Sequence, residues 1–257
     1  MDKDTLKSTE NFRLTEREQW VNYWKNAEIR PSQGTAFEEY FSDFPIDGTF
    51  SVLEIGGFPG KNLVYFKRRF PNCCINLLDY FVDHSIIQKT EKINGLPAGT
   101  IRAIEADLFD FQTEERFDMV TSFGFIEHFE DTKDVLERHI QLLKPGGELL
   151  ITLPNFLGLN GWIQKKFDPE NYSIHNLKSM NLQFLEGAMN SFNLENLQII
   201  YDGIPNLWLE PNAKVSQTTR LLIRKLAGII RRLPVFEKRW FLPYIVISGK
   251  KPTICRS

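Results

Sequence analysis

The feature that most constrains the fold of this chain is a regular alternation of short apolar segments with longer amphipathic ones, beginning at residue 50. The short segments are bounded by turn residues, which predicts strands at residues 50–55, 74–78, 101–105, 117–122 and 148–153. The segments between them have helical spacing and end near Pro or Gly, which predicts helices at 62–70, 86–93 and 132–143 and a turn at 144–147.

Strands that alternate with helices of this length form βαβ units, and right-handed crossovers then make the strands parallel. The carboxyl ends of parallel strands lie on one edge of the sheet, where ligands bind in open α/β folds. We therefore predict a doubly wound α/β fold with helices on both faces of the sheet. Beyond residue 154, we expect strands at 194–201 and 244–248, with a basic amphipathic helix at 215–233 between them.

The chain is expected to have two parts, an N-terminal helical cap at 1–49 and an α/β domain at 50–257. In the cap, Trp20, Tyr23 and Trp24 lie among charged residues, which fits one face of a short amphipathic helix. That face either covers the ligand edge as a lid or packs on the core. In both cases we expect the three aromatic residues to be buried.

A glycine-rich turn follows the first predicted strand, with Gly56, Gly57 and Gly60 in the stretch EIGGFPG at 54–60. Without a Cβ, glycine lets the backbone approach a ligand closely, and the next helix presents unpaired N–H groups that can bind an anion. The spacing differs from the G-x-G-x-x-G of dinucleotide-binding folds. Taken alone, a turn of this kind also occurs for purely structural reasons.

Acidic residues follow the next two predicted strands. Asp79 ends the second strand, where a carboxylate can accept both hydroxyls of a ribose. Asp107 follows the third strand, where it can accept the amino group of an adenine while Leu108 contacts the ring. Each alone is explained as well by a helix cap or a solvated strand end. With the glycine turn they provide, in strand order, for an amino acid, a ribose and a base, the three parts of S-adenosylmethionine (SAM).

The motifs between residues 50 and 154 resemble those of class I SAM-dependent methyltransferases in order and spacing. The stretches that carry the resemblance are 52–60, 77–80, 106–108, 117–129 and 143–153. Residues 122–129 (SFGFIEHF), followed by 143–147 (LKPGG), are similar to the small-molecule, methyltransferase type 11-like subgroup that includes ubiquinone-type enzymes. The resemblance implies a mostly parallel, seven-stranded sheet whose last strand, within 243–251, is antiparallel.

The resemblance also implies SAM as the cofactor and assigns residues to it. In strand order, these are Glu54, Gly56, Gly57 and Gly60 at the methionine end, Asp79 and Tyr80 at the ribose, Asp107 and Leu108 at the adenine, and Phe123 and Gly124 along the cofactor wall. The sequence departs from the usual pattern at Phe58, where the family has a third glycine. That departure leaves the path of the turn open.

Two histidines are candidates for a general base, which accelerates transfer to a hydroxyl by typically ~10²–10⁴-fold. His128 follows the fourth strand at the ligand edge, and His175 lies in a polar and aromatic segment at about 155–190 that is expected to bind substrate. The residues expected to bind a polar acceptor are Asn155, His175 and Asn176. The alternatives are that His128 packs structurally, that Glu127 orients His128 or caps a helix, and that the segment is an ordinary surface loop.

These residues predict a SAM-dependent methyltransferase for a small polar acceptor, with O-methylation of a sugar or glycan precursor as the leading hypothesis. N- or C-methylation of an amine or quinone-like molecule is an alternative. A non-catalytic SAM-fold binding or scaffold protein is another, and an NAD-dependent dehydrogenase is a weaker one. The acceptor, the methylated atom and the oligomeric state do not follow from the sequence.

Charge is unevenly distributed along the chain, which has 31 basic and 33 acidic residues in total. Residues 204–257 hold 11 Lys/Arg and two acids, a net charge of 11 − 2 = +9, mostly within a basic helical insertion at about 205–242. We expect its 214–239 region to contact an anionic membrane or a phosphorylated or lipid-linked acceptor, unless it packs as a cap helix with a solvated basic face. No nucleic-acid-binding module accompanies it, so nucleic acid is not expected as a partner.

The remaining features predict a cytoplasmic protein, with peripheral membrane contact if the basic region docks there. Residues 1–14 lack the apolar core of a signal peptide, and no stretch approaches the ~18 apolar residues of a membrane span. Cys73, Cys74 and Cys255 form neither a disulfide framework nor a zinc-binding spacing. We therefore expect a reducing compartment and no metal site.

Overall fold

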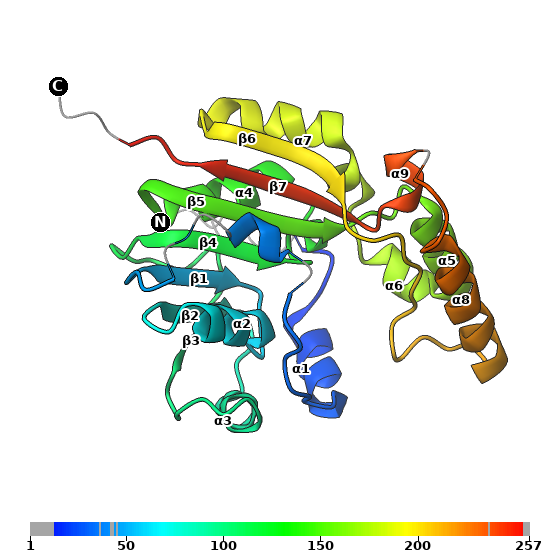
Figure 1. The fold of residues 1–257 in the computed structure, drawn as a ribbon, viewed down its shortest axis with the longest axis horizontal. Coiled ribbons are helices and arrows are strands. Elements are labelled where there is room, and N and C mark those ends of the chain that lie inside the picture. Colours follow the sequence, from blue (N-terminus) through cyan, green and yellow to red (C-terminus); the bar gives the residue numbers. More distant parts are fainter. Residues whose placement is uncertain (1–12, 36, 42–43, 45, 236, 254–257) are drawn as a thin grey trace, which may run out of the picture.

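The computed structural model describes residues 13–253 apart from 36, 42–43, 45 and 236. Within them one sheet has the strand order β3-β2-β1-β4-β5-β7-β6 (Figure 1). Its strands are β1 (Ser51–Ile55), β2 (Cys74–Asp79), β3 (Ile101–Glu105), β4 (Phe117–Phe123), β5 (Leu143–Pro154), β6 (Glu195–Asp202) and β7 (Tyr244–Lys250). Strands β1 to β5 pair in parallel, and β7 runs antiparallel to both β5 and β6. The predicted fold class is confirmed, including the antiparallel last strand.

Strand β5 begins earlier than the sequence predicts, because residues 144–147 belong to it and do not reverse the chain. Phe117 pairs with Leu143, and the next pair is Met119 with Glu148, so the additional residues form an irregularity in the ladder. Gly146 has a φ of +78°, which glycine tolerates readily. The predicted turn is wrong because glycines that accommodate a bulge have the same sequence signature as glycines in a turn.

Helices connect the strands as the alternation predicts. In chain order they are α1 (Arg17–Asn26), α2 (Lys61–Arg69), α3 (His84–Ile93), α4 (Thr132–Gln141), α5 (Leu159–Phe167), α6 (Pro169–Ser173), α7 (Leu182–Met189), α8 (Gln217–Ile230) and α9 (Lys238–Phe241). Short 3-10 turns are η1 (Glu38–Phe41), η2 (Ile126–His128), η3 (Leu177–Met180) and η4 (Asn190–Phe192). Side-chain caps mark the starts of five of these α-helices; for example, Asp83 accepts backbone N–H bonds at the start of α3 and Asp131 does so at α4.

Alternate residues of β1 point to opposite faces of the sheet, and each face packs against a different set of helices. Leu53 belongs to a core cluster with Leu136 of α4 and Leu185 of α7. Its neighbour Val52 belongs to a second cluster with Leu63 of α2. With both faces covered, the carboxyl edge of the parallel strands is the place left for polar side chains.

A third, smaller cluster joins the C-terminal helices beyond the strand ends. It contains Ile163 of α5 and Ile223 and Ile230 of α8, and Phe241 of α9 packs against it. Figure 1 shows α5 and α8 on the side of the sheet where β1, β4 and β5 end, which is also the side of α1. The predicted basic helix is α8, which ends three residues earlier than expected.

Among the described helices, none is long and apolar enough to cross a membrane. Cys73 is buried and Cys74 is exposed, both as free thiols, whereas Cys255 lies outside the described residues. Residues 1–12 also lie outside the described residues. They include the start of the predicted cap and most of residues 1–14, which are predicted not to form a signal peptide.

Candidate functional site

The turn after β1 closes over a buried carboxyl group. Glu54 is fully buried; its Oε1 accepts a hydrogen bond from Asn62 Nδ2 at 2.7 Å, and its Oε2 has no partner among the described residues. Burial raises the pKa of Glu54 to about 8. A Cβ at Gly57 would collide with this carboxyl group, and Gly60 begins α2 with a φ of +87°. The turn therefore needs glycine at both positions.

Phe58, which stands where the pattern described above has a third glycine, anchors the N-terminal helix. Its ring is buried and packs edge-on against Trp24 of α1 and against Phe81, with centroid distances of 5.3 and 5.4 Å. Gly56 provides the positive φ, +70°, with which the turn leaves β1. The turn therefore has left-handed glycines at its start and end, and a large side chain between them packs into an aromatic cluster.

Asp79, at the end of β2, holds two turns together. Its Oδ2 accepts a hydrogen bond from the Phe58 N–H at 3.0 Å, and its Oδ1 accepts one from the Phe81 N–H at 3.1 Å. Burial is the main cause that raises the pKa of Asp79 to about 6, and these N–H bonds oppose the rise. Each carboxylate oxygen can accept a further hydrogen bond. A ribose contact at Asp79 stays a prediction.

Arg13, which the sequence analysis does not single out, lies across the ends of β2 and β3. It pairs with Asp107, and its guanidinium lies 4.3 Å from the centroid of the Tyr80 ring. Arg17 pairs with Glu105 in the same region. Two residues expected at the cofactor, Tyr80 and Asp107, therefore contact the N-terminal segment. Contacts between such distant parts of the chain leave no local sequence signal.

Helix α1 and the residues before it contact the same edge of the sheet. The Leu14 N–H donates to the His128 carbonyl oxygen at 2.9 Å, and Trp20 meets the His128 ring edge-on with centroids 5.3 Å apart. Trp20 and Trp24 are half-buried, but Tyr23 is 36% exposed. The expectation of burial is therefore wrong for Tyr23, whose ring meets both tryptophans edge-on. Helix α1 and the residues before it therefore lie at the edge of the sheet that a lid over the ligand would cover.

The other residues expected at the cofactor lie near the ends of β3 and β4. Phe123 is half-buried and stacks on Phe37 with centroids 5.6 Å apart. Gly124 has a φ of +70°, which glycine adopts without strain. Leu108 is only 5% exposed and belongs to the main core cluster. Cofactor contacts of these three residues stay predictions.

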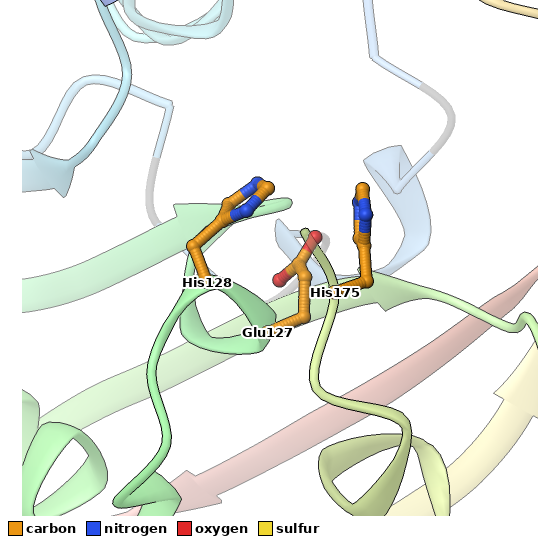
Figure 2. A group of neighbouring side chains, drawn as sticks. All are labelled: Glu127, His128 and His175. Atoms are coloured by element: carbon orange, nitrogen blue, oxygen red, sulfur yellow. The ribbon is translucent and has the colours of Figure 1, made fainter. Parts of the chain in front are cut away.

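Two histidines and a glutamate from separate segments meet at the edge of the sheet, and we call Glu127, His128 and His175 the edge triad. Figure 2 shows the Glu127 carboxyl group beside the two imidazole rings. The ring centroids lie 4.7 Å apart, and one potential ligand atom from each residue lies within 4.8 Å of the others. The Asn176 N–H donates to the Glu127 carbonyl oxygen at 2.7 Å, which ties the two segments together.

Backbone carbonyl groups fix the orientation of both imidazoles. His128 Nδ1 bonds to the Ile174 carbonyl oxygen at 3.1 Å, and His175 Nδ1 bonds to the Asn171 carbonyl oxygen at 2.6 Å. A carbonyl oxygen only accepts, so each Nδ1 carries the hydrogen and each Nε2 of a neutral ring has a lone pair. Burial and, to a smaller extent, the neighbouring His175 lower the pKa of His128 to about 3, and burial lowers the pKa of His175 to about 4. Both rings are neutral near pH 7.

Glu127 is the member of the edge triad whose role the sequence leaves open between orienting His128 and capping a helix. It does not cap η2, which begins without a side-chain hydrogen bond. Its carboxyl group is buried, its Oε2 has no partner among the described residues, and burial raises its pKa to about 8. Two imidazoles and a carboxyl group can relay a proton, and they are also a donor set that divalent transition metals use.

The two asparagines expected to bind an acceptor have structural partners instead. Asn155 is buried and donates to the carbonyl oxygens of Arg239 and Leu242 at 2.7 and 2.9 Å. Asn176 donates to the Phe129 carbonyl oxygen at 2.8 Å and caps η3 through its Oδ1. Both amides hold segments of the chain together, and acceptor contacts of Asn155 and Asn176 stay predictions.

Residues 18–199 match a family model described as a methyltransferase domain. No curated protein sequence matches the chain. Among solved structures, the fold is similar to that of an O-methyltransferase family protein from Burkholderia thailandensis, with 16% identity, a TM-score of 0.57, and coverage of 94% of this chain and 62% of that one.

Two further solved structures have the same fold. One is a phosphoethanolamine N-methyltransferase 2 from Haemonchus contortus in complex with phosphomonomethylethanolamine and S-adenosylhomocysteine (16% identity, TM-score 0.60, 91% of this chain and 57% of that one). The other is a SAM-dependent methyltransferase from Archaeoglobus fulgidus (18% identity, TM-score 0.51, 92% and 95%). The chain thus spans 62% and 57% of the length of the first two proteins.

Proposed function

This chain belongs to the methyltransferase-domain family, and we propose that it transfers a methyl group from SAM to a hydroxyl group of a small polar acceptor, with a sugar or glycan precursor as the favoured class. When bound, the sulfonium of SAM supplies an activated methyl group. The proposal rests on one observation, the buried imidazole of His128 and the half-buried imidazole of His175, both with Nε2 lone pairs at the carboxyl edge of the sheet.

The described residues fit the amino-acid and ribose ends of this cofactor. Glu54 Oε2 is a buried acceptor without a partner beneath the glycine turn, which suits an ammonium group. The oxygens of Asp79 each retain acceptor capacity at the end of β2. Arg13 pairs with Asp107 at the expected adenine position, so an adenine that binds there has to share or displace that contact.

In the proposed reaction the chain orients the acceptor and takes up a proton. One Nε2 of the edge triad accepts a hydrogen bond from the acceptor hydroxyl and takes its proton as the oxygen–methyl bond forms and the sulfur–methyl bond breaks. The backbone bonds at Nδ1 keep both rings in the orientation this requires. Trp20 covers His128, so α1 limits the access of water to the reacting groups.

The test compares methyl transfer by the wild type with transfer by His128→Ala, His175→Ala and the double variant. Formation of S-adenosylhomocysteine is measured with a panel of monosaccharides and nucleotide sugars. For a hydroxyl acceptor we expect kcat to fall by up to ~10²-fold in the double variant, the lower end of the range for general bases, because the lowered pKa of both imidazoles makes them weaker bases. SAM affinity should be unchanged. His84→Ala is the matched control, because His84 is exposed at the start of α3. Full activity in the double variant would refute the proposal that one of these histidines is a general base.

N-methylation of an amine is a second candidate, favoured by the similarity to the fold of the Haemonchus contortus N-methyltransferase. A neutral amine presents its own lone pair and requires no base. The same double variant would then retain its activity on amines, which separates the two candidates in one experiment.

A further inference from the structure

Helix α8 has an apolar stripe that faces solvent. Leu222, Leu226 and Ile229 follow one another at spacings of four and three residues, which places them along one side of the helix, and Leu233 follows in the turn after α8. Their exposed fractions are 61%, 40%, 57% and 45%. A different stripe is the one buried in the third cluster, formed by Ile223, Ala227 and Ile230. The helix therefore carries two apolar stripes, and the described residues bury only one.

Basic side chains accompany the exposed stripe. Residues 214–239 hold eight Lys/Arg and one acid, Glu237. Some of these cations serve the fold, since Arg220 donates to backbone carbonyls and Arg231 donates to Asn206. Two others, Lys225 of α8 and Arg232 just after it, are exposed beside the stripe and have no ion-pair partner within the described ranges. Their charge is available to something outside the protein.

The helices that pack with α8 each carry an exposed tryptophan. Trp162 of α5 is 53% exposed and Trp240 of α9 is 54% exposed. Both helices contribute to the cluster that α8 packs against, so all three form one unit beyond the strand ends (Figure 1). Tryptophan is enriched where a protein meets the interfacial region of a bilayer.

We propose that the exposed stripe of α8 and its basic neighbours dock on an anionic lipid surface. Aliphatic residues on one side of a helix, with Lys and Arg alongside, are typical of helices that lie in the plane of a membrane interface. A second copy of this chain fits less well, because two α8 helices would bring cations against cations. Docking would place the lipid surface on the side of the molecule where the parallel strands end (Figure 1).

The experiment is co-sedimentation of the full chain with phosphatidylcholine vesicles that contain or lack phosphatidylglycerol. We expect the partition coefficient to be at least about tenfold higher with the anionic lipid and to fall with added NaCl, because salt screens the lipid charge. The double variant Leu222→Asp/Ile229→Asp should lose binding to both kinds of vesicle. Lys225→Glu/Arg232→Glu should lose the preference for phosphatidylglycerol.

Ile46→Asp is the matched control, since Ile46 is 49% exposed and precedes β1. It should bind vesicles like the wild type. Thermal unfolding checks that every variant is folded, and SAM titration of the same variants should give unchanged affinity. That titration separates this proposal from the proposed function, since each can fail alone.

The proposal is overturned if the wild type does not sediment with anionic vesicles, or if Leu222→Asp/Ile229→Asp sediments as the wild type does. A dimer that this variant dissociates, without vesicle binding by the wild type, would also overturn it and identify the stripe as a contact between copies.

Discussion

The imidazole rings of His128 and His175 lie 4.7 Å apart, and each donates its Nδ1–H to a backbone carbonyl oxygen. The carboxyl group of Glu127 lies beside the two rings (Figure 2). Burial lowers the pKa of both imidazoles and raises the pKa of the carboxyl group. Near neutral pH all three groups are therefore mainly uncharged. Three measurable consequences follow from these protonation states and from the ability of the three side chains to bind a metal ion.

The pH profile of methyl transfer should lack the acidic limb of an ordinary histidine base. With pKa values of about 3 and about 4 in place of 6.5, both imidazoles keep their Nε2 lone pairs at acidic pH. We expect kcat at saturating SAM to stay nearly level as the pH falls from about 8 to about 5. A limb with its midpoint near 6.5 would mean that the proton acceptor is a solvated histidine and not the edge triad.

Glu127→Gln should reduce the loss of stability at alkaline pH. The pKa of Glu127 is raised from 4.5 to about 8 in the folded chain, so the folded state keeps a proton that the unfolded state releases. The free energy of unfolding therefore decreases as the pH rises from about 5 through about 8. Glutamine has no such proton, so the Tm of the variant should fall less over this range.

The control for that measurement is Glu130→Gln, because Glu130 is exposed and lies three residues away. It should follow the wild type. Parallel Tm profiles for the wild type and Glu127→Gln would contradict a buried, protonated Glu127.

Removal of divalent metal ions should leave methyl transfer unchanged. The edge triad has ligand atoms within 4.8 Å of one another, but the proposed chemistry needs only a lone pair on one imidazole. The measurement is activity after dialysis against EDTA, with and without added Zn²⁺, Mn²⁺ or Mg²⁺. If dialysis abolished activity and one of these ions restored it, the edge triad would act as a metal centre and not as a general base.

Arg13→Ala should speed the entry of SAM. Arg13 lies on the Tyr80 ring and pairs with Asp107, at the place expected for adenine. We expect the association rate constant to rise severalfold in stopped-flow tryptophan fluorescence, for which Trp20 and Trp24 are the reporters nearest the edge. Arg30→Ala is the control, since Arg30 pairs only locally with Glu28. A slower entry together with weaker affinity would show that Arg13 holds the cofactor and does not cover its place.

Most of the α/β core could be predicted because its elements are local and bounded by Gly and Pro. Strand β3, Ile101–Glu105, was predicted to the residue. Because parallel strands share one carboxyl edge, residues as distant as Asp79, Asp107 and His128 could be expected at that edge. The early start of β5 could not be predicted, because a glycine with positive φ such as Gly146 occurs both in a turn and in an irregular stretch of a strand.

Contacts between distant segments set the limit of prediction at the site. The Asn155 amide donates hydrogen bonds to the carbonyl oxygens of Arg239 and Leu242, and nothing in the sequence near residue 155 indicates those partners. The cover that Arg13 forms over Asp107 is hidden for the same reason. Burial of Glu127 likewise depends on the later segment that brings His175 beside it.

The most direct test of the account is calorimetric titration of SAM into the wild type and into Asp79→Ala. If the ribose is held at the end of β2, the wild type should bind SAM in the micromolar range, about the lower end of usual substrate affinities. The variant should bind at least ~100-fold more weakly, as expected for lost hydrogen bonds to a buried charged group. Asp110→Ala, a change at an exposed aspartate, should bind like the wild type. A wild type that ignores millimolar SAM, or a folded Asp79→Ala variant that binds it equally well, would contradict the account.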